Sequence, residues 1–146
     1  MGRIELGSTA SAGPPLSKID RKTGALTPVP GSPFKTGREP FSSSGPPGLF
    51  HPCANFRSNT VSDYLQENTG KLVEVIHFSP FETGRFPRSI VVDPKGDFVF
   101  VANDGDNNIS AYTIRNNVGV SDGVLVLATH APTGSSPYSL AVDPTG

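Results

Sequence analysis

The sequence repeats itself at a spacing of 46–50 residues, and this limits the possible folds more than any other feature. Thr23-Gly24-Ala25-Leu26 returns as Thr69-Gly70-Lys71-Leu72, and Ser32-Pro33-Phe34 returns as Ser79-Pro80-Phe81. Further matches keep the same order: Pro40 with Pro87 and Pro137, Ala54-Asn55 with Ala102-Asn103, Ser62 and Tyr64 with Ser110 and Tyr112, and Val92-Asp93-Pro94 with Val142-Asp143-Pro144. Chance explains single matches but not a preserved order, so the chain contains a repeated structural unit.

One copy of the unit predicts four short antiparallel strands. They are expected at residues 89–93, 98–102, 109–114 and 124–129, with turn-forming residues between them and a loop over 115–123. The second strand is dense in aromatic and β-branched residues, which predicts burial on both faces. Four strands within about 41 residues match one blade of a β-propeller.

Composition supports a turn-rich β fold. Gly (16) and Pro (15) disfavour long helices, and twelve of the 13 valines follow residue 60, which places most of the sheet-forming signal there. A single cysteine, Cys53, excludes a disulfide framework and a cysteine-based zinc cluster.

The net charge of −1 gives no reason to expect a nucleic-acid partner. No apolar stretch is long enough for a membrane span, and the first residues have no apolar core of a signal peptide. The sequence leaves the compartment open, because a signal could precede a missing true N-terminus. It also lacks the glycine-rich motifs that hold phosphates, and we expect no cofactor.

The segments Val92-Asp93-Pro94-Lys95-Gly96, 98–103 and 107–114 resemble the repeat of the seven-bladed lactonase-type β-propellers, a group that includes 6-phosphogluconolactonase-like and YVTN-type proteins. Residues 23–34 are similar to the connection between blades in that family. The resemblance implies an all-β fold of four-stranded antiparallel meanders. It does not fix an activity, because propellers with this repeat include enzymes and non-enzymes.

The repeat divides the chain into segments of different quality. We expect an eroded start at 1–17, the end of a first blade at 18–40, a degenerate blade at 41–87, a well-formed blade at 88–137 and the start of another at 138–146. Pro46, Pro47 and Pro52 weaken the second segment, because proline cannot donate to a ladder. This makes about two and a half blades of an expected seven, so we expect a fragment whose open blade faces self-associate.

Two groups of residues suggest metal binding only weakly. Asp104, Asp106 and Asn108 have the opening spacing of a calcium loop, but Ile109 and Arg115 stand where Gly and Glu are needed. A hairpin turn is the simpler interpretation. The three histidines, His51, His77 and His130, share no repeat position. We therefore predict no metal site.

Arg88 is the main candidate for ligand binding, with Asn103 and Asp104 as weaker candidates. The equivalent positions in the other copies hold Phe41 and Tyr138, so the repeat itself does not require the arginine. The family resemblance implies a Pro-Arg-His stretch here, whereas this chain has Pro87-Arg88-Ser89. A guanidinium at this place can hold a carboxylate or phosphate bidentately, or can bond across blades. No catalytic residue can be named.

Three functions fit the sequence. The chain is part of a propeller that hydrolyses a sugar lactone of the 6-phosphogluconolactone type, or of a non-catalytic YVTN-type interaction module, or it is a non-functional remnant. The resemblance implies a small sugar lactone or acid as ligand. We expect the isolated chain to be inactive.

Overall fold

The computed structural model describes residues 17–44, 50–67, 71–75, 79–117 and 120–143, and these segments contain strands, turns and loops but no helix. The all-β prediction is confirmed. No helix in this part of the chain is therefore long and apolar enough to cross a membrane.

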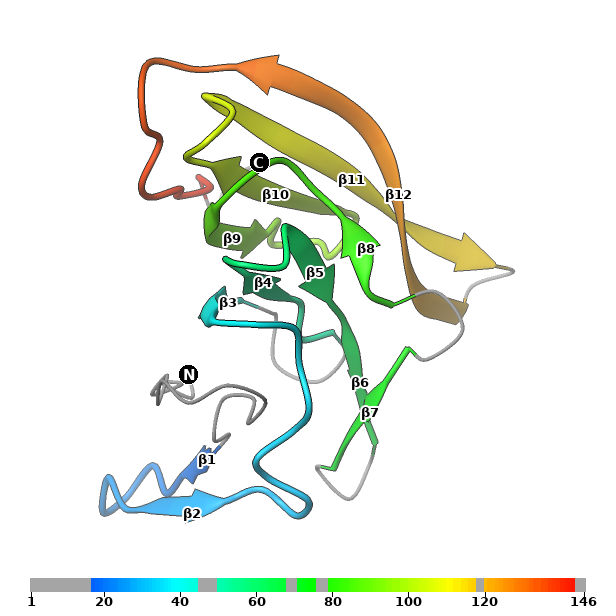
Figure 1. Ribbon diagram of the computed structural model, residues 1–146. Helices are drawn as coiled ribbons and strands as arrows, with labels where there is room; N and C mark the ends of the chain where they lie inside the picture. Colours follow the sequence, from blue (N-terminus) through cyan, green and yellow to red (C-terminus); the bar gives the residue numbers. More distant parts are fainter. Residues whose placement is uncertain (1–16, 45–49, 68–70, 76–78, 118–119, 144–146) are drawn as a thin grey trace.

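The C-terminal blade is a four-stranded antiparallel sheet with the order β12-β11-β10-β9 (Figure 1). Its strands are β9 (Pro87–Val92), β10 (Phe98–Asn103), β11 (Asn108–Asn117) and β12 (Val120–Pro132). Each strand pairs with its neighbour in sequence, so the sheet is the meander that the repeat predicts.

The predicted loop over 115–123 is wrong, because β11 and β12 continue through it. The backbones of Asn116 and Asn117 pair with those of Ser121 and Val120. Arg115 Nε also donates to Asp122 Oδ2 over 2.9 Å, and opposite charges on paired strands stabilise a sheet. Polar residues therefore extend this hairpin instead of ending it.

The middle blade has the same four-strand plan with shorter strands. They are β3 (Pro40–Ser43), β4 (Cys53–Asn55), β5 (Thr60–Ser62) and β8 (Phe81–Glu82). β4 begins only after Pro52, which has no N–H to donate. A hairpin of β6 (Tyr64–Gln66) and β7 (Leu72–Glu74) follows β5, and Asp63 alone separates β5 from β6.

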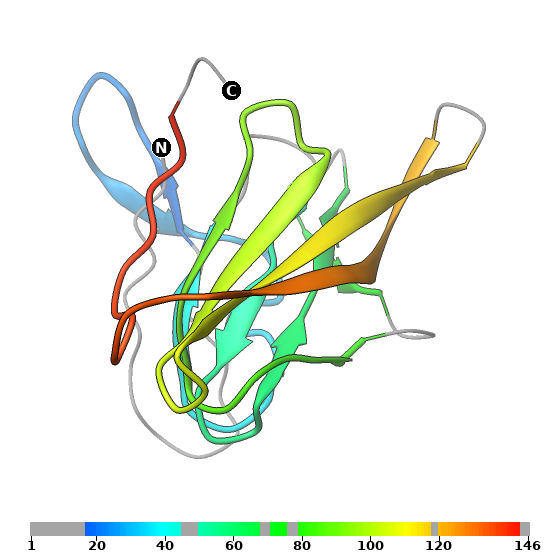
Figure 2. The same ribbon diagram turned by 90° about the horizontal axis from the view of Figure 1, so that it is seen from above.

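A third sheet consists of β1 (Ser17–Ile19) and β2 (Leu26–Pro28). Figure 1 shows the sheets stacked in chain order, from this hairpin through the middle blade to the C-terminal blade. Figure 2, the view from above, shows β12 turning back over the strands that precede it. After β12, residues 137–143 return to β9, where the Leu140 N–H donates to Ser89 Oγ over 3.1 Å.

The main apolar core lies between the middle and C-terminal blades. Its buried members are Phe50, Ala54, Val61, Ile90, Val99, Val101, Tyr112, Ile114 and Leu125. The prediction that the second strand is buried on both faces is wrong at Phe98, which is 44% exposed while Val99 is fully buried. Only one face of the C-terminal blade is thus packed against another sheet of the described chain.

The repeat holds at the level of single atoms. A Cβ added to Gly37 would lie 2.7 Å from the Asn55 side chain, and one added to Gly84 would lie 2.6 Å from that of Asn103. The hydroxyls of Tyr64 and Tyr112 donate to backbone carbonyls 29 and 30 residues earlier. The middle blade therefore keeps the internal bonds of the repeat despite its short strands.

Removing one of these hydroxyls tests the repeat. Tyr112 is 1% exposed and donates to the Glu82 carbonyl over 2.6 Å. We expect Tyr112→Phe to lower the free energy of unfolding by about 1–2 kcal/mol in urea titrations, because that carbonyl loses its donor. Tyr138→Phe is the control: the residue is 63% exposed, and the change should stay within about 0.5 kcal/mol. Equal effects of the two variants would contradict the role given to Tyr112.

Candidate functional site

The candidate site lies where the inner strands of successive blades begin. Phe41, Arg88 and Tyr138 each follow a repeat proline, at the starts of β3, of β9 and of segment 137–143. In the sheet, Pro87 pairs with Asn103 at the end of β10. This pairing places Asp104, the residue after β10, beside the start of β9, so the three candidates Arg88, Asn103 and Asp104 lie close together, while their ligand binding stays a prediction.

The Arg88 guanidinium lies among three aromatic rings. Its Cζ atom is 4.7 Å from the centre of the Phe56 ring, 5.0 Å from that of Tyr138 and 5.5 Å from that of Phe41. A cation over an aromatic face is attracted by the electron density of the ring. One arginine of the C-terminal blade thus contacts the middle blade and segment 137–143 together.

An ion pair fixes one edge of the same guanidinium. Arg88 Nε donates to Asp104 Oδ2 over 2.6 Å, and the two side chains are 24% and 18% exposed. The two Nη atoms have no hydrogen-bond partner within the described part of the chain. The arginine is therefore held in place by one nitrogen and its ring contacts, and its other donors remain available.

Arg88 also lowers the pKa of its carboxylate partner, Asp104. The hydrogen bond from the guanidinium lowers the pKa of this carboxyl, and a hydrogen bond with Ser136 lowers it further. Asp104 is thus ionised at neutral pH. A carboxylate with a lowered pKa accepts hydrogen bonds from hydroxyl groups well but is a weak general base.

The three rings that contact Arg88 continue into a fourth, that of Phe86, and we call these four rings the aromatic row: Phe86, Phe56, Phe41 and Tyr138. The ring centres of consecutive members are 5.1, 5.8 and 6.3 Å apart. Phe86, Phe41 and Tyr138 are 44%, 38% and 63% exposed. The sequence signal for Phe41 and Tyr138 was their shared repeat position, whereas nothing in the sequence pointed to Phe56 or Phe86.

Asn103 stabilises the end of β10, next to the site. Its side chain is fully buried, and Nδ2 donates to Asn108 Oδ1 and Ser110 Oγ over 2.8 Å each. Its Oδ1 accepts from Thr83 Oγ1 over 3.0 Å. Asn55 makes matching bonds to Thr60 and Ser62 in the middle blade. A direct ligand contact of Asn103 stays a prediction, while its bonds hold the end of β10.

The turn with calcium-like spacing is used for ion pairs. Asp104 binds Arg88, and Asp106 binds Arg85, whose Nε lies 2.6 Å from Asp106 Oδ1. Asn107 adopts a φ of 53°, a conformation that asparagine tolerates in turns. The described residues hold no cluster of three His, Cys, Asp or Glu side chains suited to a metal. His51 and His130 belong to different blades, and His77 lies outside the described residues.

A serine–histidine pair lies in the C-terminal blade. Ser110 Oγ and His130 Nδ1 are 3.1 Å apart, but Ser110 is fully buried and also accepts from Asn103 and Thr83. Ser62 takes the equivalent position in the middle blade, where it accepts from Asn55. The pair therefore belongs to the bonding of the repeat and offers no exposed nucleophile.

Two stacked four-stranded meanders, with an arginine–aromatic cluster at the starts of their inner strands, are the arrangement of β-propeller blades. The family model of the 7-bladed β-propeller lactonases matches residues 48–122, about half of the chain. The chain therefore belongs to this lactonase family. No curated protein matches it.

Solved structures share the fold. A putative 6-phosphogluconolactonase from Bacteroides fragilis matches with a TM-score of 0.71 and 19% identity, over 88% of this chain and 36% of that one. A functionally unknown protein from Desulfotomaculum acetoxidans matches with a TM-score of 0.66 and 24% identity, over 89% and 37%. The Pseudomonas aeruginosa periplasmic gluconolactonase matches with a TM-score of 0.61 and 17% identity, over 88% and 36%. The chain thus spans little more than a third of these proteins.

Proposed function

We propose that the surface around Arg88 binds a sugar acid or its lactone, as part of a lactonase-type propeller. The observation that carries this proposal is the Arg88 guanidinium, held by Asp104 and by the rings of Phe41, Phe56 and Tyr138, with both Nη atoms available. A guanidinium fork binds a carboxylate through two parallel hydrogen bonds. The apolar C–H face of a sugar ring suits an aromatic surface, and sugar hydroxyls can donate to Asp104.

Two of the solved structures with this fold are named for lactones of sugar acids, which supports the choice of ligand. The proposal also includes a reaction, the hydrolysis of the bound lactone. Binding without hydrolysis is the second candidate, and the lowered pKa of Asp104 favours it, because that carboxylate is a weak general base near neutral pH. Release of acid from gluconolactone above the spontaneous rate would decide in favour of hydrolysis.

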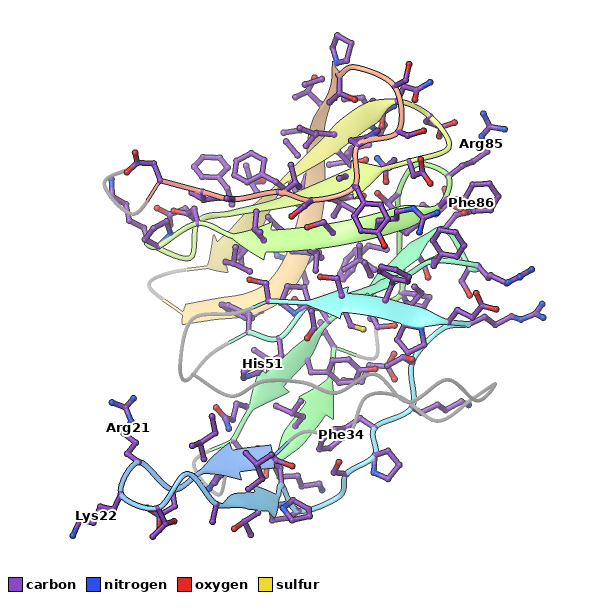
Figure 3. All side chains as sticks on the ribbon, turned by 90° about the vertical axis from the view of Figure 1, so that its left-hand side faces the viewer. Arg21, Lys22, Phe34, His51, Arg85 and Phe86 are labelled. Atoms are coloured by element: carbon purple, nitrogen blue, oxygen red, sulfur yellow. The ribbon has the colours of Figure 1, made fainter. Side chains whose placement is uncertain are left out.

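Titration calorimetry with gluconate tests the binding. Arg88→Met keeps the length and apolar contacts of the side chain but removes its donors, and we expect it to weaken binding at least about tenfold. Arg88→Lys keeps the charge without the fork, so its affinity should lie between those of the wild type and Arg88→Met. Arg21→Met is the matched control, since Arg21 lies at the far end of the stack from Arg85 and Phe86 (Figure 3).

Circular dichroism first checks that each variant is folded, and the gluconate affinities of the variants are then compared. Loss in Arg88→Met with wild-type affinity in Arg21→Met supports the proposal. Equal affinity of the two variants would contradict it. So would an absence of binding by the wild type at about 10 mM gluconate, above the range of weak specific affinities.

A further inference from the structure

The aromatic row extends beyond Arg88 toward the outer edge of the site. Phe86 stacks on Phe56, with 5.1 Å between the ring centres and an angle of 26° between the ring planes. Among the described residues, the Arg88 guanidinium makes its cation–π contacts with the other three rings and not with Phe86. A single sugar bound by Arg88 would use the rings beside the guanidinium. The Phe86 ring would then be left as a second exposed platform.

Phe86 is held in position before any ligand arrives. Its φ is 55°, which is unusual for a bulky residue, and its N–H donates to Asn59 Oδ1 over 3.0 Å. Its carbonyl accepts from the Asp104 N–H over 3.1 Å. A Cβ on Gly105 would lie 2.7 Å from the Phe86 ring, so the ring packs directly on that backbone. A ring fixed in this way loses little freedom on binding.

Charged side chains of both signs line the row. Arg85 pairs with Asp106, and Arg57 pairs with Glu39 at 2.6 Å, with 65% and 60% of the two arginine side chains exposed. Figure 3 shows Arg85 beside Phe86 at this edge. Arg85 Nε and Nη2 already donate to Asp106 and to the Gly105 carbonyl, so the edge offers exposed positive charge and carboxylate acceptors for hydroxyl groups.

We propose that the site takes a carboxylated oligosaccharide, with one acidic sugar at Arg88 and a neighbouring sugar on Phe86. This inference rests on the proposed function and specifies its ligand class. An acidic oligosaccharide carries one carboxylate per ring, apolar ring faces and many hydroxyls, which match the arginines, the aromatic row and the carboxylates in turn. A single-stranded nucleic acid also carries one negative charge per residue and stacks on aromatic side chains, so the test below includes it as the competing ligand.

The test compares a monomer with an oligomer. Calorimetry would measure the affinity of the chain for galacturonate and for its linear tetramer. Joining two sugars makes the second contact intramolecular, so we expect the tetramer to bind about tenfold more tightly. Phe86→Ala should remove this gain and leave monomer binding unchanged. Phe98→Ala is the matched control. Phe98 is equally exposed, at 44%, but it begins β10, whereas the site lies beside Asn103 at the other end of that strand.

Each result has a defined meaning. A tetramer gain that disappears only in Phe86→Ala supports the inference. Equal affinities of monomer and tetramer would overturn it while the Arg88 proposal stands, and a gain retained in Phe86→Ala would also overturn it. Tighter binding of single-stranded polyuridine, or equal binding of neutral cellotetraose, would show that the ligand class is wrong. If no sugar acid binds at all, the proposed function fails together with the inference.

Discussion

Replacing Asp63 by asparagine is expected to remove a loss of stability that the wild type shows between about pH 4 and pH 7. We expect the difference in free energy of unfolding between Asp63→Asn and the wild type to increase by about 2–3 kcal/mol from pH 5 to pH 8. Asp63 is fully buried between β5 and β6. Its Oδ1 accepts from the Tyr64 N–H over 2.8 Å, whereas the buried Oδ2 has no hydrogen-bond partner among the described residues.

Burial explains the sign of this effect. It raises the pKa of Asp63 from 3.8 to about 7, against a smaller opposing effect of the hydrogen bond from the Tyr64 N–H. Between these two pKa values the folded protein binds more protons than the unfolded chain. Stability therefore falls as the pH rises from about 4 to about 7, and the loss is complete above that. Asparagine carries no charge and removes the dependence.

Urea titrations across the pH range measure this difference. His51 has the opposite effect, because burial lowers its pKa and stability from this group rises as the pH approaches 6.5. The comparison with wild type removes that contribution. Glu82→Gln, at an exposed position, is the control for loss of a carboxylate. Parallel pH profiles of Asp63→Asn and the wild type would contradict the account.

Gly84→Ala is expected to lower the free energy of unfolding by about 2–4 kcal/mol. The new Cβ would lie within 2.8 Å of three Asn103 atoms, and Asn103 is fully buried. Asn103 cannot move without breaking its bonds to Thr83, Asn108 and Ser110. The cost thus combines overpacking with the loss of a buried hydrogen-bond network.

Two further alanine variants complete this experiment. Gly37→Ala should give a similar loss, because its Cβ would meet Asn55 in the middle blade in the same way. Gly134→Ala should change little, since nothing lies within 4 Å of its Cβ. Thermal or urea unfolding measures all three. A Gly84→Ala variant as stable as Gly134→Ala would show that the close approach has no structural role.

Most of the fold prediction came from the repeat of 46–50 residues in the sequence. The order of the matches set the blade size, and the apolar runs located β9 and β10, because turn chemistry and strand patterns are local properties. The extension of β11 and β12 was not predictable in this way. It depends on the Arg115–Asp122 pair and on backbone pairing across a polar hairpin, which are contacts between residues that look loop-forming one by one.

The candidate site was predictable only in part. Arg88 stood out because it follows Pro87 at the start of the first strand, where the family resemblance implies an arginine. The same repeat position holds Phe41 and Tyr138, and that shared position brings the three side chains together. Phe56 and Phe86 join them through the packing of neighbouring blades, which no local pattern encodes. The burial of Asp63 could not be predicted from the sequence either, since a single aspartate between two short strands looks like a turn residue.

Chemical-shift mapping with gluconate tests the central claim most directly. In the ¹⁵N-labelled protein, we predict that added gluconate shifts the Nε–Hε signal of Arg88 and the backbone amides of Asp104 and Tyr138, and leaves the Nε–Hε signal of Arg21 unchanged. Saturating shifts confined to these groups would place the sugar acid on the guanidinium and its rings. Unchanged Arg88, Asp104 and Tyr138 signals, or shifts scattered equally over Arg21, would contradict the claim.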